Sequence, residues 1–178
     1  MSIKDLVNIL PIELILKVVE HKPDSIDWKY ISQNISKLPE KFIEEYNDYI
    51  YWEYISKYQT LSEEFIERYA DELDWAAISK YQTLSEEFIE RHVDDVDWDE
   101  ISIHQELSED FIEKYADRVN WKYISVFQML SEEFIEKYAD KVNWKYIFEY
   151  QELSPEFKEK HKNKYKDEYI SNEYAYKV

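Results

Sequence analysis

Fifteen of the 40 Asp and Glu residues in this 178-residue chain fall into one regular pattern that could support chemistry. Carboxylates recur at positions i, i+4 and i+8 in five consecutive segments, a spacing that places the three carboxylates of a segment on one face of a helix. Grouped carboxylates act as general acids and bases, as ligands of hard cations, or as anions that resemble a phosphate backbone. We call this set the acidic ridge. Its members are Glu40, Glu44 and Asp48; Glu63, Glu67 and Asp71; Glu86, Glu90 and Asp94; Glu109, Glu113 and Asp117; and Glu132, Glu136 and Asp140.

The helix row that holds the acidic ridge contains no Lys or Arg in any segment, so we expect its charges to be unpaired. Like charges at i, i+4 cost about 0.2–0.5 kcal/mol per pair, and ten such pairs cost on the order of 2–5 kcal/mol before screening. Two interpretations stay open: a by-product of repeat duplication that keeps the protein dissolved, or a functional anionic surface. The adjacent row does contain cations, and its spacing predicts the ion pairs Glu64–Arg68, Glu87–Arg91, Asp110–Lys114 and Glu133–Lys137.

The rest of the composition excludes most catalytic motifs. A chain without Gly has no P-loop, dinucleotide fingerprint or nucleophile elbow, and a chain without Cys has no disulfide, thiolate zinc site or cysteine nucleophile. His92 and His104 occupy repeat positions that are aromatic elsewhere, so we expect polar variants of core or half-buried aromatics. We find no His pair at ligand spacing and no base–nucleophile arrangement, and we predict no enzyme activity, catalytic residue, metal site or cofactor. A divalent-cation buffer is a weaker hypothesis, because EF-hand loops are absent.

The net charge of −18 restricts the partners. It opposes direct binding to nucleic acid and to anionic membranes, and it favours a protein partner with a basic surface. The apolar stretch within residues 1–20 is interrupted by Lys4, Asp5, Glu13 and Lys17, so we expect neither a signal peptide nor a membrane span there. The lack of Cys is compatible with a reducing compartment, and we expect a cytoplasmic location.

An internal repeat defines the elements that must position these groups. Six Trp residues are separated by 24 residues once and then by 23 residues four times: Trp28, Trp52, Trp75, Trp98, Trp121 and Trp144. A constant period of this size is typical of stacked repeats. We therefore predict an all-α solenoid of about seven stacked two-helix repeats. Five helical-hairpin repeats occupy 38–152, a divergent N-terminal capping repeat occupies 1–37, and a C-terminal capping repeat or helix occupies 153–178.

Each repeat carries start signals for two short helices, which are unstable alone and must be held by stacking. N-cap side chains predict starts after Ser62 and Asp74, Ser85 and Asp97, Ser108 and Asn120, and Ser131 and Asn143. We expect Trp residues to form the spine of the core, and the Gln that ends each second helix to bond the last carbonyls or bridge neighbouring repeats. The predicted apolar stripes are Phe65, Ile66, Tyr69 and Ala70 in one helix and Trp75, Ile78 and Tyr81 in the other.

Two strings within the repeats carry a resemblance to known sequences. L-S-x-E-F-I-x-K-Y and N-W-x-x-I-S-x-x-Q, over about 38–152, resemble short repeats that recur in largely uncharacterised proteins of giant DNA viruses and bacteriophages. The resemblance implies a helical-repeat fold and an effector of a virus or phage, acting inside the host cell. It brings no catalytic residue to this chain.

These observations predict a non-enzymatic binding protein whose acidic ridge inhibits a host or defence nucleic-acid-binding protein by mimicking the phosphate backbone. The alternative is an adaptor or scaffold that binds a protein or peptide through the variable face of the second helices, with Tyr123, Val126 and Tyr146 as contacts. Ile103, Val126 and Met129 would add an apolar patch to that face. The identity of the partner and the oligomeric state stay open.

Overall fold

The computed structural model describes residues 12–21, 23–35 and 37–164, and every element within these ranges is a helix. The predicted all-α repeat organisation is confirmed to this extent: the helices recur with a regular Trp and Glu pattern and pack in sequence order. The chain divides into two compact units, residues 1–84 and 85–178, which we describe separately. This division falls inside the predicted repeat segment 38–152. Residues 1–11 of the predicted N-terminal cap and residues 165–178 of the predicted C-terminal cap lie outside the described residues.

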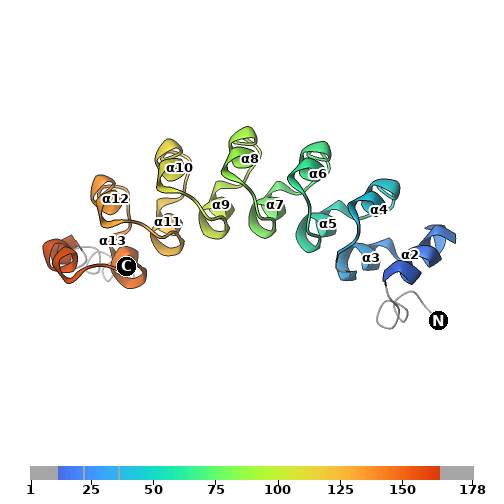
Figure 1. The fold of residues 1–178 in the computed structure, drawn as a ribbon, viewed down its shortest axis with the longest axis horizontal. Helices are drawn as coiled ribbons and strands as arrows, with labels where there is room; N and C mark the ends of the chain where they lie inside the picture. Colours follow the sequence, from blue (N-terminus) through green and yellow to red (C-terminus); the bar gives the residue numbers. More distant parts are fainter. Residues whose placement is uncertain (1–11, 22, 36, 165–178) are drawn as a thin grey trace, which may run out of the picture. The chain divides into compact units, whose positions relative to one another are not determined.

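Unit 1 alternates two kinds of helix (Figure 1). Second helices begin at a Trp, and first helices begin at a Glu after a Ser or Pro. Consecutive second helices pack against each other, α3 on α5 and α5 on α7. The elements are α2 (Ile12–His21), the 3₁₀ helix η1 (Pro23–Ser25), α3 (Trp28–Asn34), α4 (Glu40–Glu45), α5 (Trp52–Tyr58), α6 (Glu63–Arg68) and α7 (Trp75–Tyr81).

Unit 2 repeats the same alternation (Figure 1). Its second helices again pack on their neighbours, α9 on α11 and α11 on α13. The elements are α8 (Glu86–Arg91), α9 (Trp98–His104), α10 (Glu109–Lys114), α11 (Trp121–Phe127), α12 (Glu132–Lys137) and α13 (Trp144–Tyr150), followed by helical residues 155–164.

The helices start where a short polar side chain satisfies their first amide groups. The Ser131 Oγ accepts from the Phe134 amide at 3.1 Å, and the Asn143 Oδ1 accepts from the Tyr146 amide at 3.0 Å. Such caps fix where helices of only six or seven residues begin. The predicted starts are confirmed, because Ser62, Asp74, Ser85, Asp97, Ser108 and Asn120 cap in the same way.

The second helices end without glycine because the following repeat supplies the missing hydrogen bonds. Each ends at an extended Gln, such as Gln128 with φ −94° and ψ 142°. Its Nε2 donates to the carbonyls of Ser102 at 3.1 Å and Gln105 at 2.8 Å, which lie at the end of the preceding second helix. Its Oε1 accepts from the Leu107 amide at 3.1 Å. The predicted bridging role is confirmed, and Gln59, Gln82 and Gln151 make equivalent bonds.

A buried Ser in the second helices before α13 makes another bridge between repeats; in α13 the position is Phe148. The Ser125 Oγ donates to the Trp121 carbonyl at 2.7 Å and accepts from the Asn143 amide at 2.9 Å. Asn143 is the N-cap of the next second helix, so the hydroxyl links two successive repeats at the start of a helix. Full burial is tolerated because both the donor and the acceptor capacity of the hydroxyl are used. Ser32, Ser56 and Ser102 make the same contacts.

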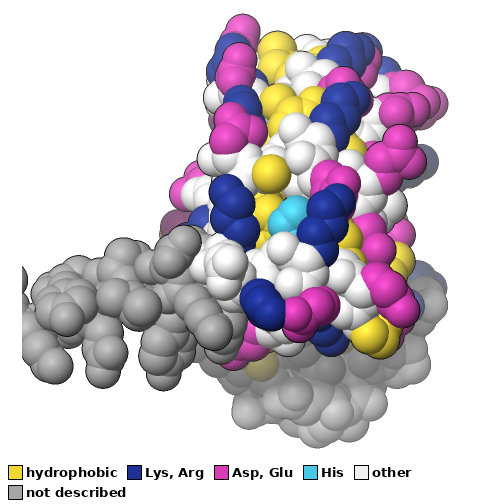
Figure 2. All heavy atoms as spheres, turned by 90° about the vertical axis from the view of Figure 1, so that its left-hand side faces the viewer, with side chains coloured by type: hydrophobic (Ala, Val, Ile, Leu, Met, Phe, Trp, Pro, Cys, Tyr) yellow, Lys and Arg dark blue, Asp and Glu magenta, His cyan; other side chains and the backbone are white. Residues whose placement is uncertain are grey.

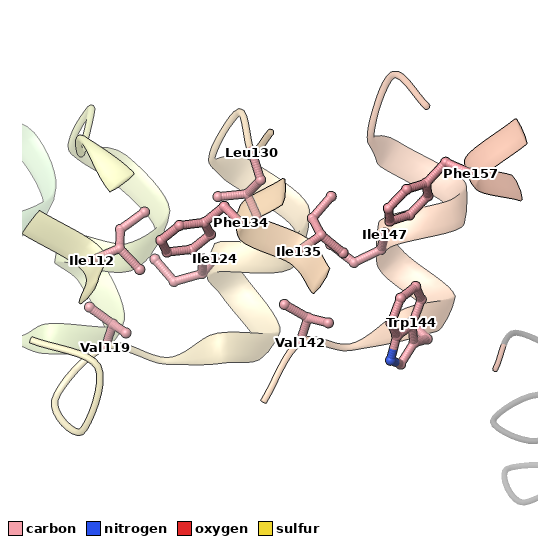
Figure 3. Close-up of a cluster of buried hydrophobic side chains, with 10 residues drawn as sticks. All are labelled: Ile112, Val119, Ile124, Leu130, Phe134, Ile135, Val142, Trp144, Ile147 and Phe157. Atoms are coloured by element: carbon pink, nitrogen blue, oxygen red, sulfur yellow. The ribbon is translucent and has the colours of Figure 1, made fainter. Parts of the chain in front are cut away.

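Isoleucine, rather than tryptophan, forms the spine of the core. In unit 2, Ile112, Ile124 and Ile135 have 0% exposure and pack with Phe134 and their neighbours (Figure 3). The indole rings lie at the edge of this spine; Trp121 contacts the Tyr138 ring with centroids 4.9 Å apart. The expectation of a Trp spine holds for the buried Trp28 and Trp144 and is wrong for the half-buried Trp52, Trp75, Trp98 and Trp121.

Candidate functional site

The first carboxylate of a repeat caps the next repeat. Glu109 Oε1 accepts from the Ser131 amide at 2.6 Å, and its Oε2 accepts from the Ser131 hydroxyl at 3.1 Å. The same hydroxyl accepts from the Phe134 amide, so Glu109 orients the group that caps α12. This column of the acidic ridge is therefore part of the stacking contacts. Glu40, Glu86 and Glu132 make the same pair of bonds with Ser62, Ser108 and Ser154.

Several of the second and third carboxylates form ion pairs with basic side chains 24 residues later. Glu113 Oε1 lies 2.5 Å from Lys137 Nζ, and Asp117 Oδ1 lies 2.8 Å from Lys141 Nζ. Both contacts join successive repeats. The other pairs are Glu44 with Arg68, Glu90 with Lys114 at 2.5 Å, Asp94 with Arg118 at 2.8 Å, and Glu136 with Lys160 and His161.

The predicted ridge of unpaired charge is wrong at these positions. Within one helix the row holds no cation, but stacking brings the cation of the following repeat beside it. The predicted intrahelical pairs of Arg68, Lys114 and Lys137 are wrong for the same reason, because each cation bonds to the preceding repeat. Figure 2 shows the outcome on one face, where dark blue Lys and Arg side chains lie directly beside magenta Asp and Glu.

These contacts favour the ionised form of both partners. The hydrogen bond from Lys137 lowers the pKa of the Glu113 carboxyl below its ordinary value, and the hydrogen bond from Lys141 lowers the pKa of Asp117. In return, the bond to Glu113 raises the pKa of Lys137. All of these pairs are exposed to solvent, where a single ion pair contributes little to stability and loses strength in salt.

Another set of carboxylates stays on the surface with no ion pair within the described part of the chain. They occupy the second position of the first helices and are exposed: Glu64, Glu87, Asp110 and Glu133. In the acidic ridge itself, Asp48 and Asp71 also have no cation 24 residues later, because those positions are Glu72 and Asp95. Accessible negative charge therefore lies both on the ridge and beside it.

The last residue of each second helix lies on the surface. Tyr81 is 47% exposed and Phe127 is 53% exposed, whereas the fourth and fifth residues of these helices, Ile and Ser, are fully buried. His104 holds the same position, is exposed, and its Nε2 lies 3.1 Å from a Glu100 carboxylate oxygen. The expectation of a core or half-buried His104 and of a buried Tyr81 is wrong.

His92, which follows the first helix α8, is half-buried against the Phe88 ring, with ring centroids 4.5 Å apart, as expected.

Phe127, Met129 and Tyr150 of unit 2 form an exposed apolar surface that we call the Phe127 patch. Met129 is 94% exposed in the loop after α11, and Tyr150 is 54% exposed at the end of α13. A shallow hollow of about 440 Å³ lies between Leu107 and Met129, and another of about 380 Å³ lies between Met129 and Tyr150. Large apolar side chains beside a hollow are typical of protein-binding surfaces.

The predicted contacts of the variable face adjoin this patch. Tyr123 and Tyr146 are half-buried, with ring centroids 6.4 Å from Phe127 and 6.0 Å from Tyr150. Val126 is half-buried and lines the second hollow. These three residues therefore support the base of the surface. Its exposed part is made by Met129, which the sequence placed in an apolar patch on this face, together with Phe127 and Tyr150, which it did not.

The corresponding face of unit 1 has different chemistry. Lys57 Nζ lies 5.2 Å from the Tyr58 ring centroid and 5.6 Å from that of Tyr81. Lys80 Nζ lies 5.7 Å from the Tyr81 centroid. On this face of unit 1, cationic side chains therefore lie over the rings of Tyr58 and Tyr81. In unit 2 the same repeat positions are Val126 and Glu149, so the rings there have no such cover.

Among residues 12–21, 23–35 and 37–164, no group of three or more His, Asp or Glu residues could hold a metal ion. Nor does any helix in that part of the chain have the length and apolar character to cross a membrane. Comparisons of the chain with protein-family models, with curated proteins and with solved structures gave no match.

Sequence reasoning missed Phe127 and Tyr150 because aromatic residues are expected in cores. The missed signal is positional. At about 100° per residue, the last residue of a second helix points roughly 110° away from the middle of the buried Ile and Ser pair. The buried Ser was missed for the opposite reason, since a small polar residue between two apolar ones is usually assigned to the surface.

Proposed function

We propose that this chain is a non-enzymatic adaptor that binds a partner protein through the Phe127 patch. The single observation that carries the proposal is the joint exposure of Phe127 and Met129 beside two hollows. A repeat protein suits this role, because its packing positions are constant while its surface positions vary between repeats. We further propose one solenoid of about seven two-helix repeats, since the 23-residue period in the sequence continues from one unit into the next.

The test compares three forms of the protein as bait: the wild type, the double variant Phe127→Ser/Met129→Ser, and the control Tyr58→Ser. Tyr58 has the same place in its repeat but lies under Lys57 in unit 1. Proteins retained from cells of the native host are identified, purified and titrated by calorimetry. Loss of a central aromatic anchor typically costs 2 kcal/mol or more, so we expect the double variant to bind about thirtyfold more weakly and the control to bind normally. Equal binding by all three forms would reject the patch as the site.

Phosphate mimicry is the second candidate, supported by the net charge of −18 and by the exposed carboxylates outside the ion pairs. Here the partner is a basic nucleic-acid-binding protein of a host or of a defence system, met inside the host cell. Neither candidate involves direct binding to nucleic acid or to a membrane. Because the acidic ridge carries stacking contacts, changing it would damage the fold and confuse the test.

The carboxylates beside the ridge give a cleaner experiment for mimicry. The variant Glu64→Gln/Glu87→Gln/Asp110→Asn/Glu133→Gln removes four charges that form no ion pair among the described residues. Binding to a basic nucleic-acid-binding partner is then measured at low and high salt. Mimicry requires that both the substitutions and the salt weaken binding, since the interaction would be ionic. An affinity that ignores both changes would eliminate this candidate.

A further inference from the structure

We infer that the Phe127 patch takes a short extended peptide segment of its partner, with two apolar side chains three residues apart and Lys or Arg residues on both flanks. The inference rests on the proposed function and names the kind of segment that this surface recognises.

The two hollows provide two apolar binding pockets. The first is lined by Leu107, Phe127 and Met129, and the second by Phe127, Met129 and Tyr150 together with buried Leu130. The same two exposed side chains thus form a wall that both hollows share. Such a wall separates two neighbouring pockets, each wide enough for one aliphatic side chain, and this arrangement suits two apolar residues from one bound segment.

The charge at the rim is of one sign. Glu106 lines the first hollow and Glu152 the second, both exposed, and exposed Glu149 lies beside Tyr150 on α13. Neither hollow is lined by a Lys or Arg. The equivalent rings of unit 1 lie under Lys57 and Lys80. Of these two faces, only the Phe127 patch therefore combines apolar pockets with an acidic rim. Basic residues next to the apolar ones would be attracted, and acidic residues would be repelled.

The repeat spacing sets the distance between the apolar side chains. The hollows belong to consecutive repeats, and packed helices lie about 8–10 Å apart. A segment in the extended polyproline II conformation has three residues per turn and rises about 3.1 Å per residue, so side chains three residues apart point to the same side and lie about 9 Å apart. Residues at i and i+3 of such an extended segment therefore match neighbouring hollows.

Labelled synthetic peptides test this inference on the full-length protein by fluorescence anisotropy. The probe is KKSLSSLSKK, and its controls are EESLSSLSEE, KKSSSSSSKK and KKSLLSSSKK, which alter the flanking charge, the apolar residues and their spacing. We expect the probe to bind about tenfold more tightly than any control and to weaken as salt is raised. The variant Glu106→Gln/Glu149→Gln/Glu152→Gln should lose most of this preference for Lys over Glu flanks, whereas Glu64→Gln/Glu87→Gln/Glu133→Gln, which removes as many exposed charges elsewhere, should keep it.

The inference is overturned if the probe shows no saturation up to about 1 mM, or if it binds no better than its controls. It is also overturned if sedimentation shows a dimer that Phe127→Ser/Met129→Ser dissociates, because a second copy would then cover the patch. The proposed function fails separately, when a captured partner protein binds the Phe127→Ser/Met129→Ser variant as well as the wild type. If the binding of a captured partner depends on Phe127 and Met129 but not on the rim glutamates, the adaptor function is supported and the proposed peptide chemistry is wrong.

Discussion

The polar side chains that recur from repeat to repeat are the ones that bond to a neighbouring repeat. Gln128 closes the end of the preceding second helix, Ser125 holds the start of the next one, and Glu109 orients the Ser that caps the following first helix. Each of these polar groups satisfies or orients hydrogen-bonding groups at a helix end. In ordinary helices this is done by glycine, by aspartate or by a local capping box. A chain without a single glycine can therefore turn twice in every 23 residues.

The buried glutamines provide the sharpest stability test at this scale. Replacing Gln128 with Ala leaves the carbonyls of Ser102 and Gln105 and the amide of Leu107 without their partner. Each unsatisfied buried group costs about 1–3 kcal/mol, so we expect the free energy of unfolding in urea to fall by roughly 2–4 kcal/mol. Gln33→Ala, at an exposed position, is the matched control and should change it by less than about 0.5 kcal/mol. A small effect at Gln128 would contradict the bridging role.

The ion pairs between repeats predict a dependence of stability on pH. The pKa values of Glu113, Asp117 and Glu136 are lowered by the cations that face them. A lowered pKa gives stability that is present above the unfolded value and is lost as the pH falls through the folded value. The melting temperature should therefore be constant near neutrality and decline as the pH falls below the ordinary values of 4.5 for Glu and 3.8 for Asp.

Two variants assign this decline to its cause. Lys137→Met and Lys141→Met remove the cations that face Glu113 and Asp117. Together they should make the acid decline shallower, and added salt should do the same in the wild type. The exposed Lys122→Met, whose cation faces the Tyr123 ring instead, is the control. An unchanged acid profile in the double variant would show that other carboxylates govern the response.

At the scale of the helix, the cap of each first helix is assembled from two repeats. Ser131→Ala removes the side chain that accepts from the Phe134 amide, and such losses cost about 0.5–2 kcal/mol. We expect Glu109→Ala to destabilise less when Ser131 is already Ala, because its carboxylate then has only the amide to bind. A double-mutant cycle from urea unfolding measures this coupling. Purely additive effects would mean that Glu109 does not act through the Ser131 hydroxyl.

The helix starts were predictable from sequence, whereas the partners of the side chains were not. Ser62 and Asp74 act locally, three residues from the amides that they cap, so one repeat contains the whole signal. Glu113 and Lys137 are 24 residues apart and meet only after stacking, so a search within one helix assigns Glu113 no cation. For the candidate site, the predicted Tyr123, Val126 and Tyr146 adjoin the Phe127 patch, but the exposure of Phe127 and Tyr150 depends on the angle of that face to the core.

For the whole molecule, stacking contacts that recur every 23 residues mean that stability grows repeat by repeat. In unit 2 the second helices pack on their immediate neighbours, α9 on α11 and α11 on α13. Removing residues 107–129 takes out one complete repeat and joins Glu106 to Leu130. The shortened chain keeps the register of every bridge: Gln151 then stands where Gln128 stood, Ser131 where Ser108 stood, and Lys137 where Lys114 stood.

We expect this deletion variant to fold, with unchanged helical circular dichroism per residue and a lower free energy of unfolding, because one interface between repeats is lost. It should also no longer bind the KKSLSSLSKK peptide, since Phe127 and Met129 are absent. Removing residues 107–126, three residues fewer, is the control: it shifts the Gln, Ser and Glu bridges that cross the new junction out of register and should leave the C-terminal part unfolded. If both deletions folded equally well, the bonds between repeats would not define the fold. If neither folded, one whole repeat could not be removed without unfolding the others.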